Sequence, residues 1–175
     1  MTAPATRVST NRRLWRLLIL LTATIGSDQA SKYVAREFLP PSGSSYLFGL
    51  VRLSLVENHG GFLGIVASLP DEWRFLLLTV GVAVLLGGCL IILLRLLDHA
   101  SPLWLPLALI TGGGLGNLLD RLRGDGGVTD FLILGSGLLQ TGIFNLADVY
   151  ILTGSFILGA QLLQGPDKPQ GPRRD

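Results

Sequence analysis

The sequence predicts an all-α membrane protein with four transmembrane helices and a small extracytoplasmic β-sheet element. Apolar amino acids make up 49% of the 175 residues, and charged ones only 15%. Several uncharged runs also reach about 20 residues, the length that a helix needs to cross a bilayer. A soluble domain of this size needs more charged surface to cover its core. We therefore expect the helices to face lipid.

The first span is expected at about residues 14–31, directly after an arginine-rich stretch. This order is also typical of a secretory signal peptide. However, no small-x-small cleavage site follows, and the next residues are charged at helical spacing. We predict an uncleaved helix that continues past Asp28 towards Arg36.

Three further apolar runs predict spans at about residues 75–95, 101–120 and 142–163. The stretches 75–94 and 100–119 contain no charged residue. The last run is preceded by Gly135-Ser136-Gly137, which separates a loop portion from the helix, and it contains Asp148. One acid is therefore expected inside the fourth span.

Basic residues predict the orientation, because they are enriched on the cytoplasmic side of membrane proteins. Arginines precede the first span, and further basic residues follow the fourth. Both termini should then be cytoplasmic, with the segments at about 32–73 and 121–141 on the other side. Residues 1–166 would form one domain, followed by a disordered cytoplasmic tail at 167–175.

Residues 45–56 in the longer outer segment are rich in β-formers, and part of this stretch alternates as a half-buried strand does. We expect a small sheet there, resting on the outer membrane face. The net charge of +2 comes from basic residues that mainly flank apolar runs. Membrane orientation explains them better than nucleic-acid binding.

Ionisable residues gather at the predicted extracytoplasmic side, although such residues are costly in or near a membrane and are by default functional there. They are Asp28, Lys32, Asp120, Arg121, Asp130 and Asp148. The chain has one cysteine and two histidines, and no CxxC, HExxH or GxxxxGK[ST] pattern. We expect no metal and no cofactor.

A pair of carboxylates can hydrolyse a peptide bond without a metal. The ionised acid takes a proton from water while the protonated acid polarises the scissile carbonyl. Two acids held close together share one proton, because ionising both is costly.

Four sequence pieces together resemble the lipoprotein signal peptidase family, the signal peptidase II type of membrane aspartic peptidase. They are DQASK from Asp28, ENHGG from Glu57, GNLLDRLRGDGGVTDF from Gly116, and FNLADVYI from Phe144. The resemblance covers nearly the whole membrane portion in the order of the family. It implies an enzyme of the bacterial inner membrane that cuts diacylglyceryl-modified prolipoproteins N-terminal to the lipidated cysteine.

The resemblance also implies roles for single residues. Asp130 and Asp148 would be the catalytic pair. The supporting or substrate-binding residues would be Asp28, Lys32, Asn58, Gly60, Asn117, Asp120, Arg121 and Asn145. The implied partners are the prolipoprotein substrate and membrane lipid.

The residues themselves leave two questions about the acids. Asp28 and Lys32 stand at i and i+4, which favours a structural salt bridge. Asp120 rivals Asp130 as the partner of Asp148, but we expect the neighbouring Arg121 to keep Asp120 ionised. Asn145 and Asp148 stand at i and i+3, so an amide should lie beside the second acid.

Two departures from the family pattern keep other functions open. The run after Asn58 is Gly60-Gly61-Phe62-Leu63-Gly64, and the Asp120–Asp130 spacing is one residue longer, with Asp125 inside it. A proton-coupled transporter would also explain intramembrane acids, but its acids should be spread through the membrane. A catalytically inactive assembly protein with this fold is the other alternative.

Overall fold

Helices make up most of the chain in the computed structural model, which describes residues 10–61, 66, 68–96 and 101–164. The predicted tail at 167–175 and the run Phe62–Gly64 lie outside the described residues. The helices are α1 (Thr10–Phe38), α2 (Asp71–Phe75), α3 (Val82–Leu96), α4 (Trp104–Arg123) and α5 (Leu146–Gln164). A π-helical segment, η3 (Leu76–Gly81), links α2 to α3 without a break.

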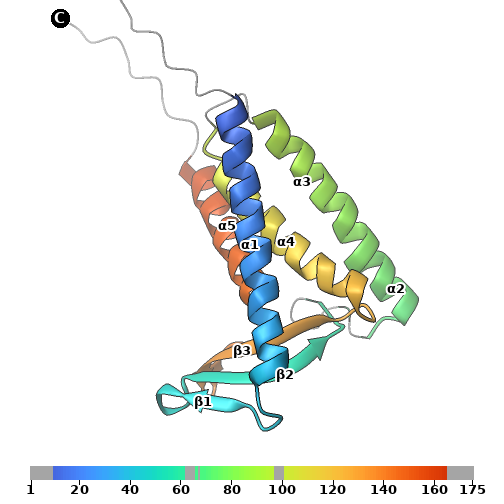
Figure 1. The fold of residues 1–175 in the computed structure, drawn as a ribbon, viewed down its shortest axis with the longest axis vertical. Coiled ribbons are helices and arrows are strands. Elements are labelled where there is room, and N and C mark those ends of the chain that lie inside the picture. The colour runs from blue at the N-terminus through green and yellow to red at the C-terminus, as the bar shows by residue number, and fades with distance from the viewer. Residues whose placement is uncertain (1–9, 62–65, 67, 97–100, 165–175) are drawn as a thin grey trace, which may run out of the picture.

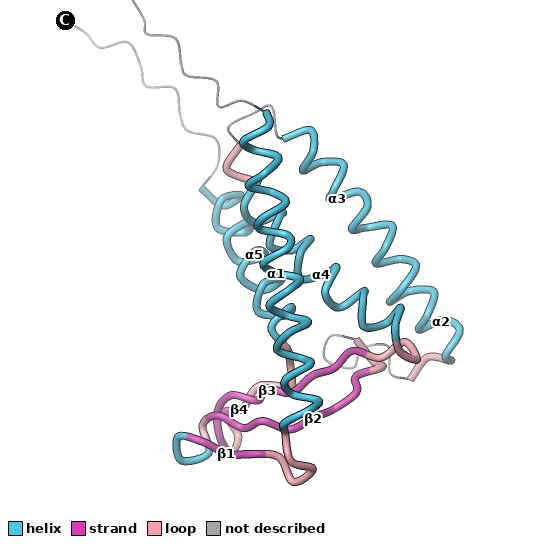
Figure 2. The backbone as a smooth tube through the Cα atoms, in the orientation of Figure 1, coloured by secondary structure: helices cyan, strands magenta, loops and turns pink. Residues whose placement is uncertain are grey.

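A small antiparallel sheet lies across one end of the helices (Figures 1 and 2). Its strands are β1 (Ser44–Tyr46), β2 (Val51–Asn58), β3 (Val128–Ser136) and β4 (Leu139–Gln140), in the spatial order β1-β2-β3-β4. The predicted mostly helical fold with a small sheet is therefore confirmed. The sheet brings the two predicted outer segments together, because β2 pairs with β3.

Residues 45–56, part of which we expected as a strand, contain parts of β1 and β2 with a turn, η1 (Leu47–Gly49), between them. The boundaries differ from the prediction in two other places. The stretch 128–136, which we expected as loop, is a strand. The last helix begins at Leu146 rather than near 142, because Phe144 still exchanges backbone hydrogen bonds with Leu132 of β3, at 3.0 and 2.9 Å.

Within the described residues, two helical stretches are long and apolar enough to cross a membrane. They are Asp71–Leu96, with a mean hydropathy of 2.8, and Leu146–Gln164, with 1.6. The helices α1 and α4 are 29 and 20 residues long and carry most of the buried polar residues described below. The number of spans stays a prediction.

Glycines let three helices approach the backbone of α4. A Cβ atom at Gly112 would lie 2.1 Å from Thr24 Oγ1 of α1, and one at Gly113 would lie 2.5 Å from the Ala147 carbonyl oxygen of α5. At Gly114 it would lie 2.6 Å from Leu86 Cδ2 of α3. These contacts make α4 the centre of the bundle and bring its outer end against α1, α5 and the sheet.

Candidate active site

Asp130 lies on β3, opposite Val56 of β2, and its side chain is only 2% exposed. Its Oδ2 accepts a hydrogen bond from Asn58 Nδ2 at 2.8 Å, and its Oδ1 accepts one from Asn145 Nδ2 at 2.6 Å. No cation in the described part of the chain forms an ion pair with it. Neutral amides therefore hold this carboxyl group.

Burial raises the pKa of Asp130 to about 6. The nearby carboxylate of Asp148 contributes to this increase, whereas the hydrogen bonds from Asn58 and Asn145 and the charge of Lys32 lower the pKa. Asp130 therefore keeps its proton to a higher pH than an ordinary aspartic acid does, which suits the acid member of a carboxyl pair.

The second acid, Asp148, lies in the first turn of α5 and is half-buried. Its Oδ1 accepts a hydrogen bond from Asn117 Nδ2 at 3.0 Å. Its Oδ2 accepts one from the Asn145 backbone N–H at 3.1 Å, and Asn145 Oδ1 accepts one from the Asp148 backbone N–H at 3.0 Å. This reciprocal pair is a capping box, in which Asn145 is the N-cap residue.

Asn145 connects the two acids. Its side-chain amide binds Asp130, and its backbone and side-chain oxygen fix Asp148 in the capping box. The amide also donates to Asn117 Oδ1 at 3.1 Å. We predicted an amide beside the second acid, but expected Asn145 within the helix. The structure places it just before α5, where it is 0% exposed and contacts both carboxyl groups.

Lys32 organises a separate group of acids behind this pair. Its Nζ lies 2.9 Å from Asp28 Oδ2 and 2.9 Å from Asp120 Oδ2, and it donates to Asn117 Oδ1 at 2.8 Å. Lys32 and Asp28 are 0% exposed. The predicted ion pair between Asp28 and Lys32 is present. Asn117 joins this group to Asp148.

The expected pairing of Asp120 with Arg121 is wrong. Asp120 is paired with Lys32, and Arg36 Nη2 lies 3.8 Å from its Oδ1. Adjacent residues of a helix point in different directions, so they are poorly placed to pair. Asp120 does have a cationic partner, as we expected, but this partner is Lys32 of α1.

Arg121 instead lies towards the acid pair. It is 9% exposed and interacts electrostatically with Asp148, Asp130 and Asp120. Within the described ranges its Nε has no hydrogen-bond partner.

Asp28 also has a second role, because its Oδ1 accepts a hydrogen bond from the Ala147 backbone N–H of α5 at 3.0 Å. The first backbone N–H groups of a helix have no partner within the helix, and negative charge is favoured there. Asp28 therefore binds α1 to the beginning of α5, next to the acid pair.

The loop after β2 carries the remaining predicted residues. Asn58 Oδ1 accepts a hydrogen bond from the Gly60 backbone N–H at 3.0 Å, which closes a tight turn. Asn58 Nδ2 contacts the Gly61 carbonyl oxygen at 3.3 Å as well as Asp130. Gly60 thus supports the donor of Asp130 through its backbone.

Three residues near the site were missed in the sequence. Gln29 Nε2 donates to Asp120 Oδ1 at 3.0 Å, and the Thr129 backbone N–H donates to Asp120 Oδ2 at 3.3 Å. Arg36 Nε donates to Thr129 Oγ1 at 2.9 Å. The spacing of Asp28, Lys32 and Arg36 could have indicated that Arg36 shares their helix face.

Two hollows flank the site on its outer side. One, of about 410 Å³, is lined by His59, Asp125 and residues of α2 and η3. The other, of about 270 Å³, is lined by Arg36, Glu57, Asp120, Arg123 and Gly124. Neither is lined by Asp130 or Asp148. His59 Nε2 lies 3.8 Å from Asp125 Oδ1, so the extra acid contacts the loop that follows β2.

The described residues contain no group of three or more His, Cys, Asp and Glu side chains placed to hold a metal ion. A family model described as "Signal peptidase (SPase) II" matches residues 20–164 of the chain. The chain belongs to the signal peptidase II family. It is accordingly a peptidase, and the transporter and assembly-protein alternatives are not favoured.

Relatives agree with this family over most of their length. The "Lipoprotein signal peptidase" of Moorella thermoacetica is 39% identical over 148 residues, which is 83% of this chain and 91% of the relative. That of an Azoarcus species is 37% identical over 161 residues, which is 90% of this chain and 89% of the relative.

A solved structure described as a bacterial membrane enzyme has the same fold. It superimposes with a TM-score of 0.74 at 20% identity, covering 91% of this chain and 93% of its own. The chain therefore shares the arrangement of helices and sheet of that structure.

Proposed function

We propose that the chain is an aspartic endopeptidase that removes the signal peptide from diacylglyceryl-modified bacterial prolipoproteins, on the N-terminal side of the lipidated cysteine. The shared name of its relatives supports the substrate class. The observation that carries the mechanism is the position of Asn145, which contacts both carboxyl groups through its side chain and backbone.

In this proposal the two acids have different roles. Asp130 is buried between two amide donors, and its pKa is raised to about 6, so it holds the proton and polarises the scissile carbonyl. Asp148 lies at a helix N-terminus and accepts two N–H groups, which favours negative charge. Asp148 therefore takes the proton from the attacking water, and Asp130 protonates the carbonyl oxygen.

Arg121 would assist by stabilising negative charge as the carbonyl oxygen is attacked. It is buried and interacts electrostatically with Asp148 and Asp130. Asn117 and Lys32 would fix the position of Asp148, because Asn117 donates to Asp148 and accepts from Lys32. Asn58 and Gly60 would border the bound peptide on the sheet side.

We further propose four spans in the bacterial inner membrane, with both termini cytoplasmic and the acid pair at the extracytoplasmic face. The 29 residues of α1 and the 20 of α4 are enough to cross a bilayer. Their low hydropathy has a local cause, because they carry Asp28, Lys32 and Asp120 in buried contacts. In this orientation the lipid chains of the substrate remain in the bilayer while the scissile bond reaches water.

The test is to incubate the purified protein with a diacylglyceryl-modified prolipoprotein and to measure the released signal peptide. We expect cleavage that persists in EDTA, because two carboxyl groups need no metal. The unmodified prolipoprotein is the matched control and should be cut far more slowly. Absence of cleavage would contradict the substrate assignment, and loss of cleavage in EDTA with recovery in zinc would contradict the mechanism.

A further inference from the structure

Large apolar side chains gather at one end of the sheet. Two loops contribute them, the η1 turn between β1 and β2 and the turn between β3 and β4. We call the resulting surface the apolar tip, and it consists of Tyr46, Leu47, Phe48, Leu50, Leu138 and Leu139. Phe48 and Leu138 are fully exposed, and Leu139 is 89% exposed. Exposure of several neighbouring large apolar groups is unusual unless they have a partner.

Hydrogen bonds hold the two loops together as one surface. The Gly135 backbone N–H donates to the Leu50 carbonyl oxygen at 2.8 Å. Arg52 of β2 donates a hydrogen bond to Gln140 of β4. The tip is therefore a rigid continuation of the sheet rather than two independent loops.

The backbone of the η1 turn is strained in a way that exposes its side chains. Leu47 and Phe48 have φ values of 49° and 57°, in the left-handed region that residues other than glycine rarely adopt. Neither side chain gains burial in return, since Leu47 is 66% exposed. Strain of this kind indicates a functional constraint.

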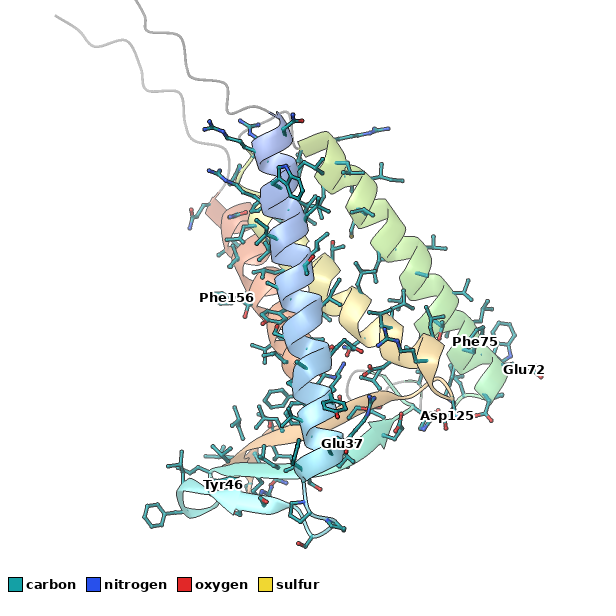
Figure 3. All side chains as sticks on the ribbon, in the orientation of Figure 1. Glu37, Tyr46, Glu72, Phe75, Asp125 and Phe156 are labelled. Carbon is teal, nitrogen blue, oxygen red and sulfur yellow. The ribbon has the colours of Figure 1, made fainter. Side chains whose placement is uncertain are left out.

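Charge is absent from the segments that form the tip. Residues 38–51 and 131–147 contain no Asp, Glu, Lys, Arg or His. The opposite end of the sheet and its surroundings carry charged residues, including Glu57, Arg123 and Asp125. Figure 3 shows Tyr46 and Asp125 at the two opposite ends. The sheet thus has a mainly apolar end, which Arg52 borders, and a charged end.

The apolar end extends sideways beyond the helices, on the side of α5 (Figures 1 and 3). There the outward face of α5 presents further exposed apolar side chains, among them Val149, Leu152 and Phe156. In a membrane enzyme this face meets lipid. The apolar tip extends on the same side of the molecule as this face of α5 (Figure 1).

We propose that the apolar tip inserts into the interface of the outer leaflet and holds the sheet against the bilayer. Leucine and phenylalanine would enter the acyl boundary, and the hydroxyl of Tyr46 would remain among the headgroups. Because β3 carries Asp130 near one end and reaches the tip at the other, insertion fixes the depth of this acid. The choice of leaflet rests on the orientation given under Proposed function.

The test measures depth directly with nitroxide labels. Cys89 is the sole cysteine and is replaced by alanine, after which Phe48→Cys and Leu138→Cys are each labelled in vesicles of phosphatidylethanolamine and phosphatidylglycerol. Both positions are fully exposed, so neither substitution removes packing. Ser42→Cys is the matched control, since Ser42 is exposed near the other end of β1.

We expect collision with oxygen, relative to collision with a water-soluble nickel chelate, to be severalfold higher at 48 and 138 than at 42. Equal ratios at all three positions would overturn the proposal. Spin–spin broadening at position 48 that disappears on dilution with unlabelled protein would overturn it in favour of contact between two copies. The measurement needs no turnover, so its result is independent of whether prolipoprotein is cleaved.

Discussion

Two groups of acids lie side by side at the sheet end of the bundle, and they are held by different partners. Asp28 and Asp120 share the ammonium group of Lys32, at 2.9 Å from each. Asp130 and Asp148 receive hydrogen bonds from amides and backbone N–H groups instead. Lys32 places a full positive charge against Asp28 and Asp120, whereas Asp130 and Asp148 accept hydrogen bonds from neutral donors. We therefore propose a structural role for the first group and acid–base chemistry for the second.

The largest loss of activity is expected when either Asp130 or Asp148, the pair held by amides, is replaced. Asp130→Asn and Asp148→Asn each remove a group that changes protonation during the reaction. Each variant should therefore lower kcat by ~10²–10⁴-fold. The double variant should be scarcely worse than either single one, because residues that act as a unit are not additive. Release of signal peptide under single-turnover conditions measures this.

The control for that experiment is Asp120→Asn. It loses the charge that faces Lys32 but keeps an amide, so residual turnover and poorer accumulation are expected. A stable Asp120→Asn variant without activity, beside a fully active Asp130→Asn variant, would show that Asp148 is paired with Asp120 instead.

Removing the cation should mainly affect folding. Lys32→Met leaves the buried Asp28 without its counter-charge and leaves Asp120 only the more distant Arg36, at 3.8 Å. Breaking a buried pair in this way costs ~3–5 kcal/mol. Arg74→Met is the matched control, since Arg74 pairs with the exposed Asp71 on the outer surface, where an ion pair contributes about 0–1 kcal/mol. Thermal unfolding in detergent compares the two variants. Equal midpoints would contradict a structural role for the Lys32 group.

A smaller loss of stability is expected when a side chain is added at Gly116 of α4, which lies against Asp28. A Cβ atom at Gly116 would lie 2.6 Å from Asp28 Oδ2, so Gly116→Ala must displace this carboxylate, at about 1–3 kcal/mol. Nothing lies within 4 Å of a Cβ atom at Gly87 in α3, which makes Gly87→Ala the control. Gly87→Ala should be neutral or slightly stabilising. Unfolding midpoints that fall equally would contradict the contact.

The smallest effect is expected when the hydrogen bond from the Asn58 amide to Asp130 is removed. Asn58 lowers the pKa of Asp130 through its hydrogen bond, so Asn58→Ala should raise that pKa above about 6. Because Asp130 must hold a proton, kcat falls as the pH rises through its pKa. The alkaline limb of the kcat profile should therefore move to higher pH in the variant. A change in KM alone, with an unmoved limb, would assign Asn58 to substrate contact only.

Local geometry explains what could be predicted from the sequence. The pair of Asp28 and Lys32 follows from helical spacing, and the helices follow from long apolar runs. The ionic partner of Asp120 could not be predicted from helical spacing, because Lys32 belongs to another helix and lies 88 positions earlier in the chain. Only the structure shows that Lys32 Nζ lies 2.9 Å from Asp120 Oδ2. Sequence neighbourhood favoured Arg121, although only tertiary packing decides which cation is near.

The beginning of α5 shows a signal that was present but read incompletely. The sequence Asn145-Leu146-Ala147-Asp148 has a capping residue followed three positions later by an acid, which is the pattern of a capping box. Apolar character alone extended the predicted helix back to residue 142. Strand β3 was missed for a related reason, since its apolar residues 131–134 merged with the run leading into the last helix.

The capping box links the orientation of Asp148 to the folding of the last helix. Asp148 is oriented by the same hydrogen bonds that begin α5, and Asp28 of α1 accepts another from the Ala147 backbone N–H. A chain whose last helix has not docked against the first lacks the contact between Asp28 and Ala147. Under the proposed function, cleavage therefore depends on the docking of α5 against α1.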